Sequence, residues 1–188
     1  MTARLVIAWL LATAAGGAAA ADAPFGVLDI ALGASHARLE RELDFRELEA
    51  ALAGAPSGKP DLGRRGYACM RRDDDFADTA CVSHSERLDG IETREIRLHF
   101  LEGRLQQFSL TAEVQHYAAV IGYLQARFGA PQTTPVQRAG EQPSVKWQSE
   151  AAQIVAYRGK DLVFVNFEVA SYPAAVKRKR DGERLQCD

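Results

Sequence analysis

The residues of this 188-residue chain best suited to redox or nucleophilic chemistry are its three cysteines, Cys69, Cys81 and Cys187. Cys69 and Cys81 flank a short polar segment of the kind found at the tip of a hairpin between two strands. In an oxidising compartment such a pair is interpreted first as a disulfide, which would stabilise the fold by about 3 kcal/mol because it restricts the unfolded chain. Cys187 is then left over. Its pairing with Cys69 or Cys81, or with a second chain, stays an alternative.

The four histidines lack the spacing of a metal or catalytic motif. His36, His84, His99 and His116 form no i, i+4 pair and no HExxH sequence. His84 lies beside Ser83, but neighbouring residues on a strand point to opposite faces, so a nucleophile–base pair is not predicted. The sequence therefore predicts no catalytic residue, no cofactor and no metal ligand. A small enzyme that uses His84 or His99 together with a nearby carboxylate remains an alternative.

The densest group of charged residues is Arg-Arg-Asp-Asp-Asp at residues 71–75, which Asp78 follows closely. Carboxylates are the ligands that calcium prefers, so a calcium site is one interpretation. The segment lacks the alternating Asp-x-Asp-x-Asp-Gly spacing of a calcium loop, and its two arginines would neutralise the charge. We therefore predict a solvated hairpin tip.

The N-terminal residues indicate the compartment that the chain reaches. Arg4 precedes an apolar stretch at residues 5–15, and Ala18 and Ala20 provide the small side chains that a signal peptidase requires. A membrane anchor needs about 20 predominantly apolar residues, which is roughly twice the length of this stretch. We therefore predict a cleaved signal peptide at residues 1–20. No cysteine lies near the cleavage site, so a lipid anchor is not predicted. The expected destination is the periplasm, with secretion as the alternative.

Composition limits the classes of partner. The formal net charge is −2, which argues against nucleic acid because phosphate binding needs a concentrated excess of lysine and arginine. No second apolar stretch is long enough to span a bilayer. One basic run, residues 177–180, lies in a segment, residues 171–188, that we predict to be a mobile, solvated tail. Attraction of this run to anionic headgroups or to an acidic partner is the alternative.

Hydrophobic periodicity predicts the elements that position these residues. Residues 95–100 alternate polar and apolar side chains, a Glu-Gly turn follows, and residues 105–112 return, which predicts a half-buried antiparallel hairpin. Residues 114–128 change to helical spacing. Further strands are predicted at residues 145–147, 154–157 and 162–169.

The order of the elements suggests two repeated units. In residues 25–112 a helix that begins after Ser35, either bent or in two parts, precedes short strands and the hairpin. In residues 113–170 a helix again precedes antiparallel strands. We predict the α+β class, with a curved antiparallel sheet and helices packed on one face, as a single domain over residues 24–170.

Short motifs in both units are similar to a known group of envelope proteins. Residues 128–131 (Phe-Gly-Ala-Pro), Trp147 and residues 163–167 (Val-Phe-Val-Asn-Phe) carry the likeness in the second unit. Residues 32–35 (Leu-Gly-Ala-Ser) and 98–105 (Leu-His-Phe-Leu-Glu-Gly-Arg-Leu) carry it in the first. The chain resembles the SmpA/OmlA-like family and the fold of the β-lactamase inhibitor protein. The resemblance implies a fold whose members mostly bind other proteins without catalytic residues. The missing lipid-site cysteine departs from the lipoprotein members.

Aromatic side chains supply the candidate binding surface. Trp147, Tyr157 and Phe164 are candidates for the sheet face turned away from the helices, where large aromatics would anchor an interface; the core is their alternative place. We therefore predict a non-catalytic, exported adaptor whose partner is another envelope or periplasmic protein. A periplasmic carrier of a small molecule or ion, with a dry cavity lined by Trp147, is the second interpretation.

Overall fold

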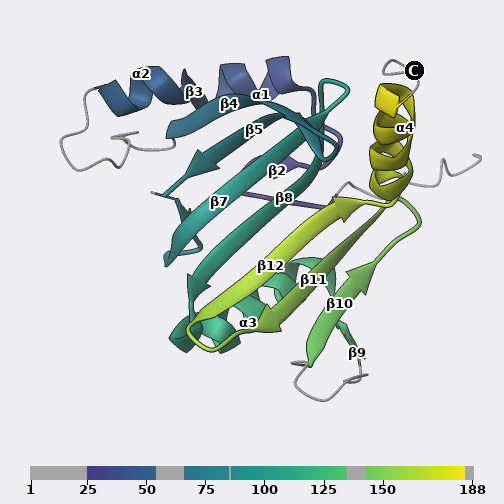
Figure 1. Ribbon diagram of the computed structural model, residues 1–188. Helices are drawn as coiled ribbons and strands as arrows, with labels where there is room; N and C mark the ends of the chain where they lie inside the picture. Colours follow the sequence, from purple (N-terminus) through teal and green to yellow (C-terminus); the bar gives the residue numbers. More distant parts are fainter. Residues whose placement is uncertain (1–24, 54–65, 85, 135–142, 185–188) are drawn as a thin grey trace, which may run out of the picture.

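The computed structural model describes residues 25–53, 66–84, 86–134 and 143–184, so the predicted signal peptide and Cys187 lie outside the described residues. The described chain is α+β, as predicted, with one large sheet and four α-helices (Figure 1). None of these helices is long and apolar enough to cross a membrane.

The strands are short at the N-terminus and long in the middle of the chain. Their bounds are β1 (Gly26–Val27), β2 (Ile30–Ala31), β3 (Asp44–Glu47), β4 (Gly66–Asp74), β5 (Ala77–Ser83), β6 (Arg87–Leu88), β7 (Ile91–Leu101), β8 (Arg104–Glu113), β9 (Gln132–Thr134), β10 (Ser144–Gln148), β11 (Ala152–Arg158) and β12 (Leu162–Val169). The large sheet has the order β3-β4-β5-β7-β8-β12-β11-β10-β9, with β6 beside β7, and β1 pairs with β2 separately. Only the β3–β4 pairing among the described strands is parallel.

The β7–β8 hairpin turns at Glu102 and Gly103, where the sequence predicts a tight turn. Both residues have positive φ, 55° and 68°, which is the combination that matches a two-residue turn to the twist of its strands. The backbone N–H of Glu102 donates to the carboxylate of Asp78 on β5 at 2.7 Å. A contact from the neighbouring hairpin therefore holds the non-glycine residue in its left-handed conformation.

One face of the sheet carries the main core. Leu98 and Phe108 are completely buried there, and the ring of Phe108 stacks on that of Phe167 with centroids 4.2 Å apart. Two helices cover this face, α1 (His36–Glu42) through Leu39 and α3 (Tyr117–Phe128) through Leu124. A single-turn 3-10 helix, Val114–His116, precedes α3.

The other two helices pack against the opposite face. Ala51 of α2 (Leu48–Ala53) lies against Ala68 of β4, and Ala175 of α4 (Tyr172–Arg184) lies in a cluster with Leu101 of β7. Ala68 and Leu101 alternate with core residues along their strands, so both point away from the main core. The prediction that the helices pack on one face is therefore wrong. We call the face that carries α2 and α4 the open face, because helices cover only parts of it.

The C-terminal segment differs from the predicted mobile tail. Residues 172–184 form α4, which stands at the end of the sheet (Figure 1). Tyr172, Ala175 and Val176 have the i, i+3, i+4 spacing of one helical face, and all three are buried. The burial of these three residues stabilises α4. The charged residues 177–180 alone do not predict a helix. Residues 185–188 lie outside the described residues.

Candidate functional site

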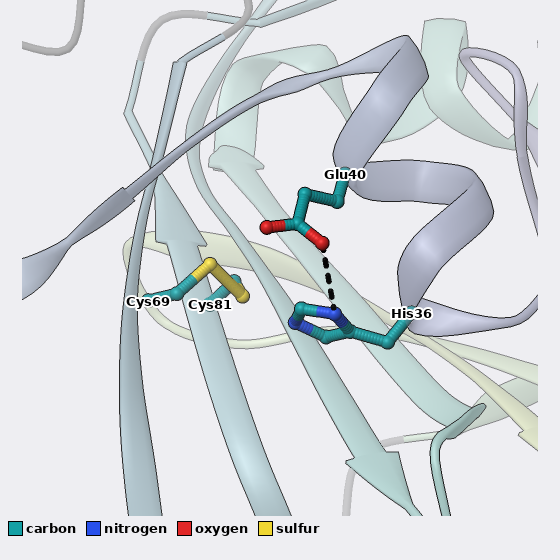
Figure 2. Close-up of a disulfide and its surroundings, with 4 residues drawn as sticks. All are labelled: His36, Glu40, Cys69 and Cys81. Carbon is teal, nitrogen blue, oxygen red and sulfur yellow. Dashed lines mark ion pairs between the residues drawn. A yellow bond between two sulfur atoms is a disulfide. The ribbon is translucent and has the colours of Figure 1, made fainter.

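The predicted disulfide is present. Cys69 on β4 and Cys81 on β5 lie directly opposite each other in the sheet and are joined by a disulfide (Figure 2). The two residues belong to the main core and are 7% and 1% exposed. Disulfide exchange requires that a thiolate reach one of the sulfur atoms, and this burial restricts such access. The bond therefore acts as a structural cross-link between β4 and β5.

A cleft of about 390 Å³ lies beside the disulfide, between α1 and the strands β3, β4 and β5. The imidazole of His36 packs edge-on against Phe100, with ring centroids 4.8 Å apart, and its Nδ1 lies 3.7 Å from a carboxylate oxygen of Glu40. Figure 2 shows this imidazole turned toward the disulfide. Both cysteine sulfurs are bonded, so His36 has no thiol to activate. The i, i+4 spacing of His36 and Glu40 is the sequence signal for this pair, and the sequence analysis did not use it.

The two histidines of the enzyme alternative lie in separate depressions of the open face. His84 Nδ1 is 3.0 Å from the carbonyl oxygen of Arg94. His99 Nδ1 is buried and has no hydrogen-bond partner among the described residues. Burial lowers the pKa of His99, and the positive charges of Arg97 and Arg72 lower it further. Neither His84 nor His99 forms an ion pair with a carboxylate in the described part of the chain, so the geometry does not support a catalytic dyad.

The three predicted interface aromatics lie on different faces. Trp147 is 3% exposed, belongs to the main core, and donates its indole N–H to the carbonyl oxygen of Gly129 at 2.8 Å. The prediction that Trp147 lies in an interface is therefore wrong. Trp147 lies in the core, which was the alternative. Tyr157 on β11 and Phe164 on β12 lie opposite each other and stack, with ring centroids 4.9 Å apart. Both alternate with core residues along their strands, and both are half-buried on the open face.

The described aspartates at the β4–β5 turn are paired with basic groups of the same chain. The carboxylate of Asp74 accepts hydrogen bonds from the backbone N–H groups of Phe76 and Ala77, both at 3.0 Å, and pairs with Arg72 at 2.6 Å. Burial alone would raise the pKa of Asp74, but the hydrogen bonds from Arg72 and the backbone lower it on balance. No cluster of His, Cys, Asp or Glu within the described ranges is arranged to hold a metal ion. The side chain of Asp73 lies outside the description.

The turn also presents one aromatic ring to solvent. Phe76 is 58% exposed, while its carbonyl oxygen accepts a hydrogen bond from the Tyr172 hydroxyl at 2.9 Å. Lys179 of α4 donates to the carbonyl oxygens of Asp74 and Ala77 at 2.7 and 3.2 Å. The backbone of the turn is therefore fixed by α4 while the ring of Phe76 stays accessible. Phe76 has no signal in the sequence, because a single phenylalanine in an acidic segment produces no periodic pattern.

Comparison with known proteins gives a distant structural likeness. No family model matches the chain, and no curated protein matches it. The fold is similar to that of a GTP-binding regulator from Thermotoga maritima, with 15% sequence identity and a TM-score of 0.36, over 63% of this chain and 78% of that chain. A likeness at this level carries no argument about function, and the resemblance to small envelope proteins stays a prediction.

Two regions of the described chain leave aromatic side chains accessible to solvent. The first is the open face, where the Tyr157–Phe164 pair lies between polar side chains. The second is the β4–β5 turn with Phe76. In the first region the hydrogen bond described for His84 goes to the carbonyl oxygen of Arg94, and not to a hydroxyl or carboxylate side chain.

Proposed function

We propose that the protein is an exported, non-catalytic binding protein of the cell envelope whose partner is another periplasmic or envelope protein. The observation that carries the proposal is the stacked Tyr157–Phe164 pair on the open face. Export rests on the signal peptide predicted at residues 1–20. The Cys69–Cys81 disulfide supports it, because disulfides form and persist in oxidising compartments. Secretion to the medium is the alternative location.

The aromatic pair has the properties of an interface anchor. The cross-strand pairing of β11 with β12 fixes both rings, so binding would cost little side-chain entropy. Beside Phe164 lies a shallow depression of about 470 Å³ whose other lining residues are His84, Arg94, Glu95, Thr111 and Leu162. An apolar centre within a polar rim is the usual composition of a protein interface. The partner that fits this surface offers an apolar pocket for the two rings and hydrogen-bonding groups around it.

The arrangement of the sheet is compatible with this role. We infer that the sheet curves around the partner, and that residues 25–112 and 113–170 are two repeats of a helix followed by strands. The order of elements supports the inference, because α1 precedes β4 to β8 and α3 precedes β10 to β12. A small-molecule carrier with a cavity lined by Trp147 has less support, because Trp147 packs inside the main core.

The binding proposal is tested by site-specific photo-crosslinking in the organism of origin. A photoreactive phenylalanine analogue replaces Phe164 in one variant and the exposed Lys177 of α4 in a control variant. We expect a discrete adduct with one exported protein from position 164, and loss of this adduct when Tyr157→Ala is added. An adduct pattern identical at positions 164 and 177, or no adduct at position 164, would reject the Tyr157–Phe164 pair as the binding surface.

Export is tested separately by sequencing the N-terminus of the protein recovered from the periplasmic fraction. We expect the chain to begin at Ala21, directly after the predicted cleavage site. Recovery of the uncleaved chain from the cytoplasm would contradict export and leave the binding surface to be judged by the crosslinking result alone.

A further inference from the structure

The depression of the open face that His99 lines is a candidate binding cleft, separate from the depression beside Phe164. It has a volume of about 210 Å³ and lies where α2 meets β4, β5 and β7. Its floor contains Ala80 and Val82 of β5, and Leu48 of α2 and Met70 of β4 form its apolar walls. Ligand pockets for drug-sized molecules start near 300 Å³, so this cleft is sized for a single side chain rather than a whole ligand.

The cleft exists because small side chains on β5 separate long side chains on its two neighbours. His99 of β7 lies opposite Ala80, and Arg97 lies opposite Val82. On the other side of β5, Arg72 extends from β4. Side chains on one face of neighbouring strands stand nearly parallel, so the long ones leave a hollow above the short ones.

The described charged residues that line this hollow are two arginines. Arg72 and Arg97 border it, and their side chains are 48% and 50% exposed. Each guanidinium pairs with a carboxylate on its own strand, Asp74 at 2.6 Å and Glu95 at 2.8 Å. Exposed ion pairs contribute little to stability, so either guanidinium can exchange its partner for an incoming anion at small cost.

His99 lines the same hollow and has one ring nitrogen without a partner among the described residues. Its Nδ1 is buried, with no hydrogen-bond partner in the described ranges of the chain. A buried polar atom of this kind raises the free energy of the folded protein. The groups around it are few: Arg97 on its own strand, Arg72 and Asp74 on β4, and the uncharged Gln107 directly opposite on β8. From α2 it is the apolar Leu48 that lines the cleft.

We propose that this cleft receives a glutamate or aspartate side chain of the protein partner, with an apolar residue of the partner next to it. The inference rests on the proposed binding function and specifies what the partner presents. The carboxylate pairs with Arg72 and Arg97 and accepts a hydrogen bond from His99. The adjacent apolar residue packs on Met70 and on Leu52 of α2, which are 37% and 38% exposed. Leu52 follows Leu48 by one helical turn, so both lie on the same side of α2.

The pH dependence of binding follows from the surroundings of His99. In the free protein the pKa of His99 is lowered, first by burial and then by Arg97 and Arg72, so the imidazole is neutral at neutral pH. A bound carboxylate favours the imidazolium and raises that pKa. Binding therefore takes up a proton, and affinity increases as pH falls through the pKa of the complex and levels off below the pKa of the free protein.

The experiment is an NMR titration of the isotope-labelled protein with N-acetyl-Leu-Glu-Leu-amide and with its glutamine match. We expect the glutamate peptide to bind about ten-fold more tightly and to shift the resonances of β4, β5 and β7 around the cleft. Binding should strengthen as the pH is lowered from about 8 to about 6, and this trend should vanish in His99→Gln. Equal affinity for the two peptides would overturn the proposal.

Matched variants distinguish binding in the cleft from nonspecific attraction between the peptide and the charged protein surface. The double variant Arg72→Gln/Arg97→Gln should abolish the preference for glutamate. Arg87→Gln is the control, because Arg87 is also an exposed arginine paired with a carboxylate, Glu92, but lies outside the cleft. If inorganic phosphate alone shifts the same resonances as strongly as the peptide, the site is a general anion site and the peptide proposal fails. If the peptide binds here while position 164 forms no adduct, the inference survives and only the interface at Tyr157 and Phe164 is wrong.

Discussion

The ammonium group of Lys179 on α4 lies 3.0 Å from the carboxylate of Asp78 on β5. The same carboxylate accepts the backbone N–H of Glu102 at the β7–β8 turn. Lys179 also donates to two carbonyl oxygens of the β4–β5 turn. One lysine and one aspartate therefore join α4 to the turns of two hairpins, which explains why a helix so rich in charge docks on the sheet.

Replacing Lys179 with methionine should release α4 from the sheet. The lysine side chain is only 19% exposed, and hydrogen bonds to a charged group are worth roughly 1.5–3 kcal/mol, so the docking of α4 should weaken by about 2 kcal/mol. Hydrogen exchange of the α4 amides and tryptic cleavage within α4 should both accelerate. Lys177→Met is the control, because Lys177 is exposed on the same helix. Equal rates in the two variants would show that Lys179 does not hold α4.

Removal of the disulfide should cost stability without changing the fold. Cys69 and Cys81 are 12 residues apart in sequence, and closing a loop of this size stabilises a protein by about 3 kcal/mol in the chain-entropy model. We expect the free energy of unfolding of the double variant Cys69→Ala/Cys81→Ala, measured by urea denaturation, to be lower by this amount. Cys187→Ser should leave the urea midpoint unchanged. Mass spectrometry of the unreduced protein provides the direct check, since alkylation of Cys69 and Cys81 in the folded protein would contradict the bond.

The sequence predicts the elements whose contacts are local. The β7–β8 hairpin is encoded by alternation and by the Glu102–Gly103 turn, and the disulfide by the two cysteines around a turn. The strand β12 was expected at the centre of the sheet or under a helix, and it lies between β8 and β11. In the hairpin and the disulfide, residues close together along the chain determine the structure, so a pattern in the sequence is sufficient.

The elements that the sequence does not predict depend on distant contacts. The helix predicted after Ser35 is interrupted at residues 44–47, which form β3 because β4 offers an edge for parallel pairing. The helix α4 has three buried residues in its first turns, and most of its other residues are charged. The cleft of Arg72, Arg97 and His99 combines two strands that are separated by a third. No local sequence pattern indicates which side chains lie close together on neighbouring strands.

Substitution of Trp147 should report on the core rather than on an interface. The indole N–H donates to the Gly129 carbonyl, so Trp147→Phe leaves that oxygen unpaired and also loses buried volume. We expect a destabilisation of about 2 kcal/mol in urea unfolding. The chain has two tryptophans, Trp9 and Trp147, and Trp9 lies in the predicted signal peptide. Emission from the processed protein should therefore be blue-shifted and resistant to iodide; emission typical of a solvated indole would contradict the burial of Trp147.

Ionisation of Tyr172 should undock α4 at high pH. Burial, together with the nearby carboxylates of Glu168 and Asp74, raises the pKa of Tyr172 from 10.0 to about 12. The neutral phenol is thus favoured in the folded state, so its contribution to stability is complete below pH 10 and is lost as the pH rises from 10 to about 12. The phenolate also loses the proton that it donates to the Phe76 carbonyl.

The measurement is a thermal unfolding series across this pH range, compared with Tyr172→Phe. The variant lacks the hydrogen bond at every pH, so it should be less stable than the parent protein at neutral pH. It also lacks the titrating group, so its unfolding temperature should fall less steeply between pH 10 and 12 than that of the parent protein. Parallel curves for the two proteins would show that Tyr172 does not titrate in this interval and that the link between α4 and the β4–β5 turn is independent of its charge.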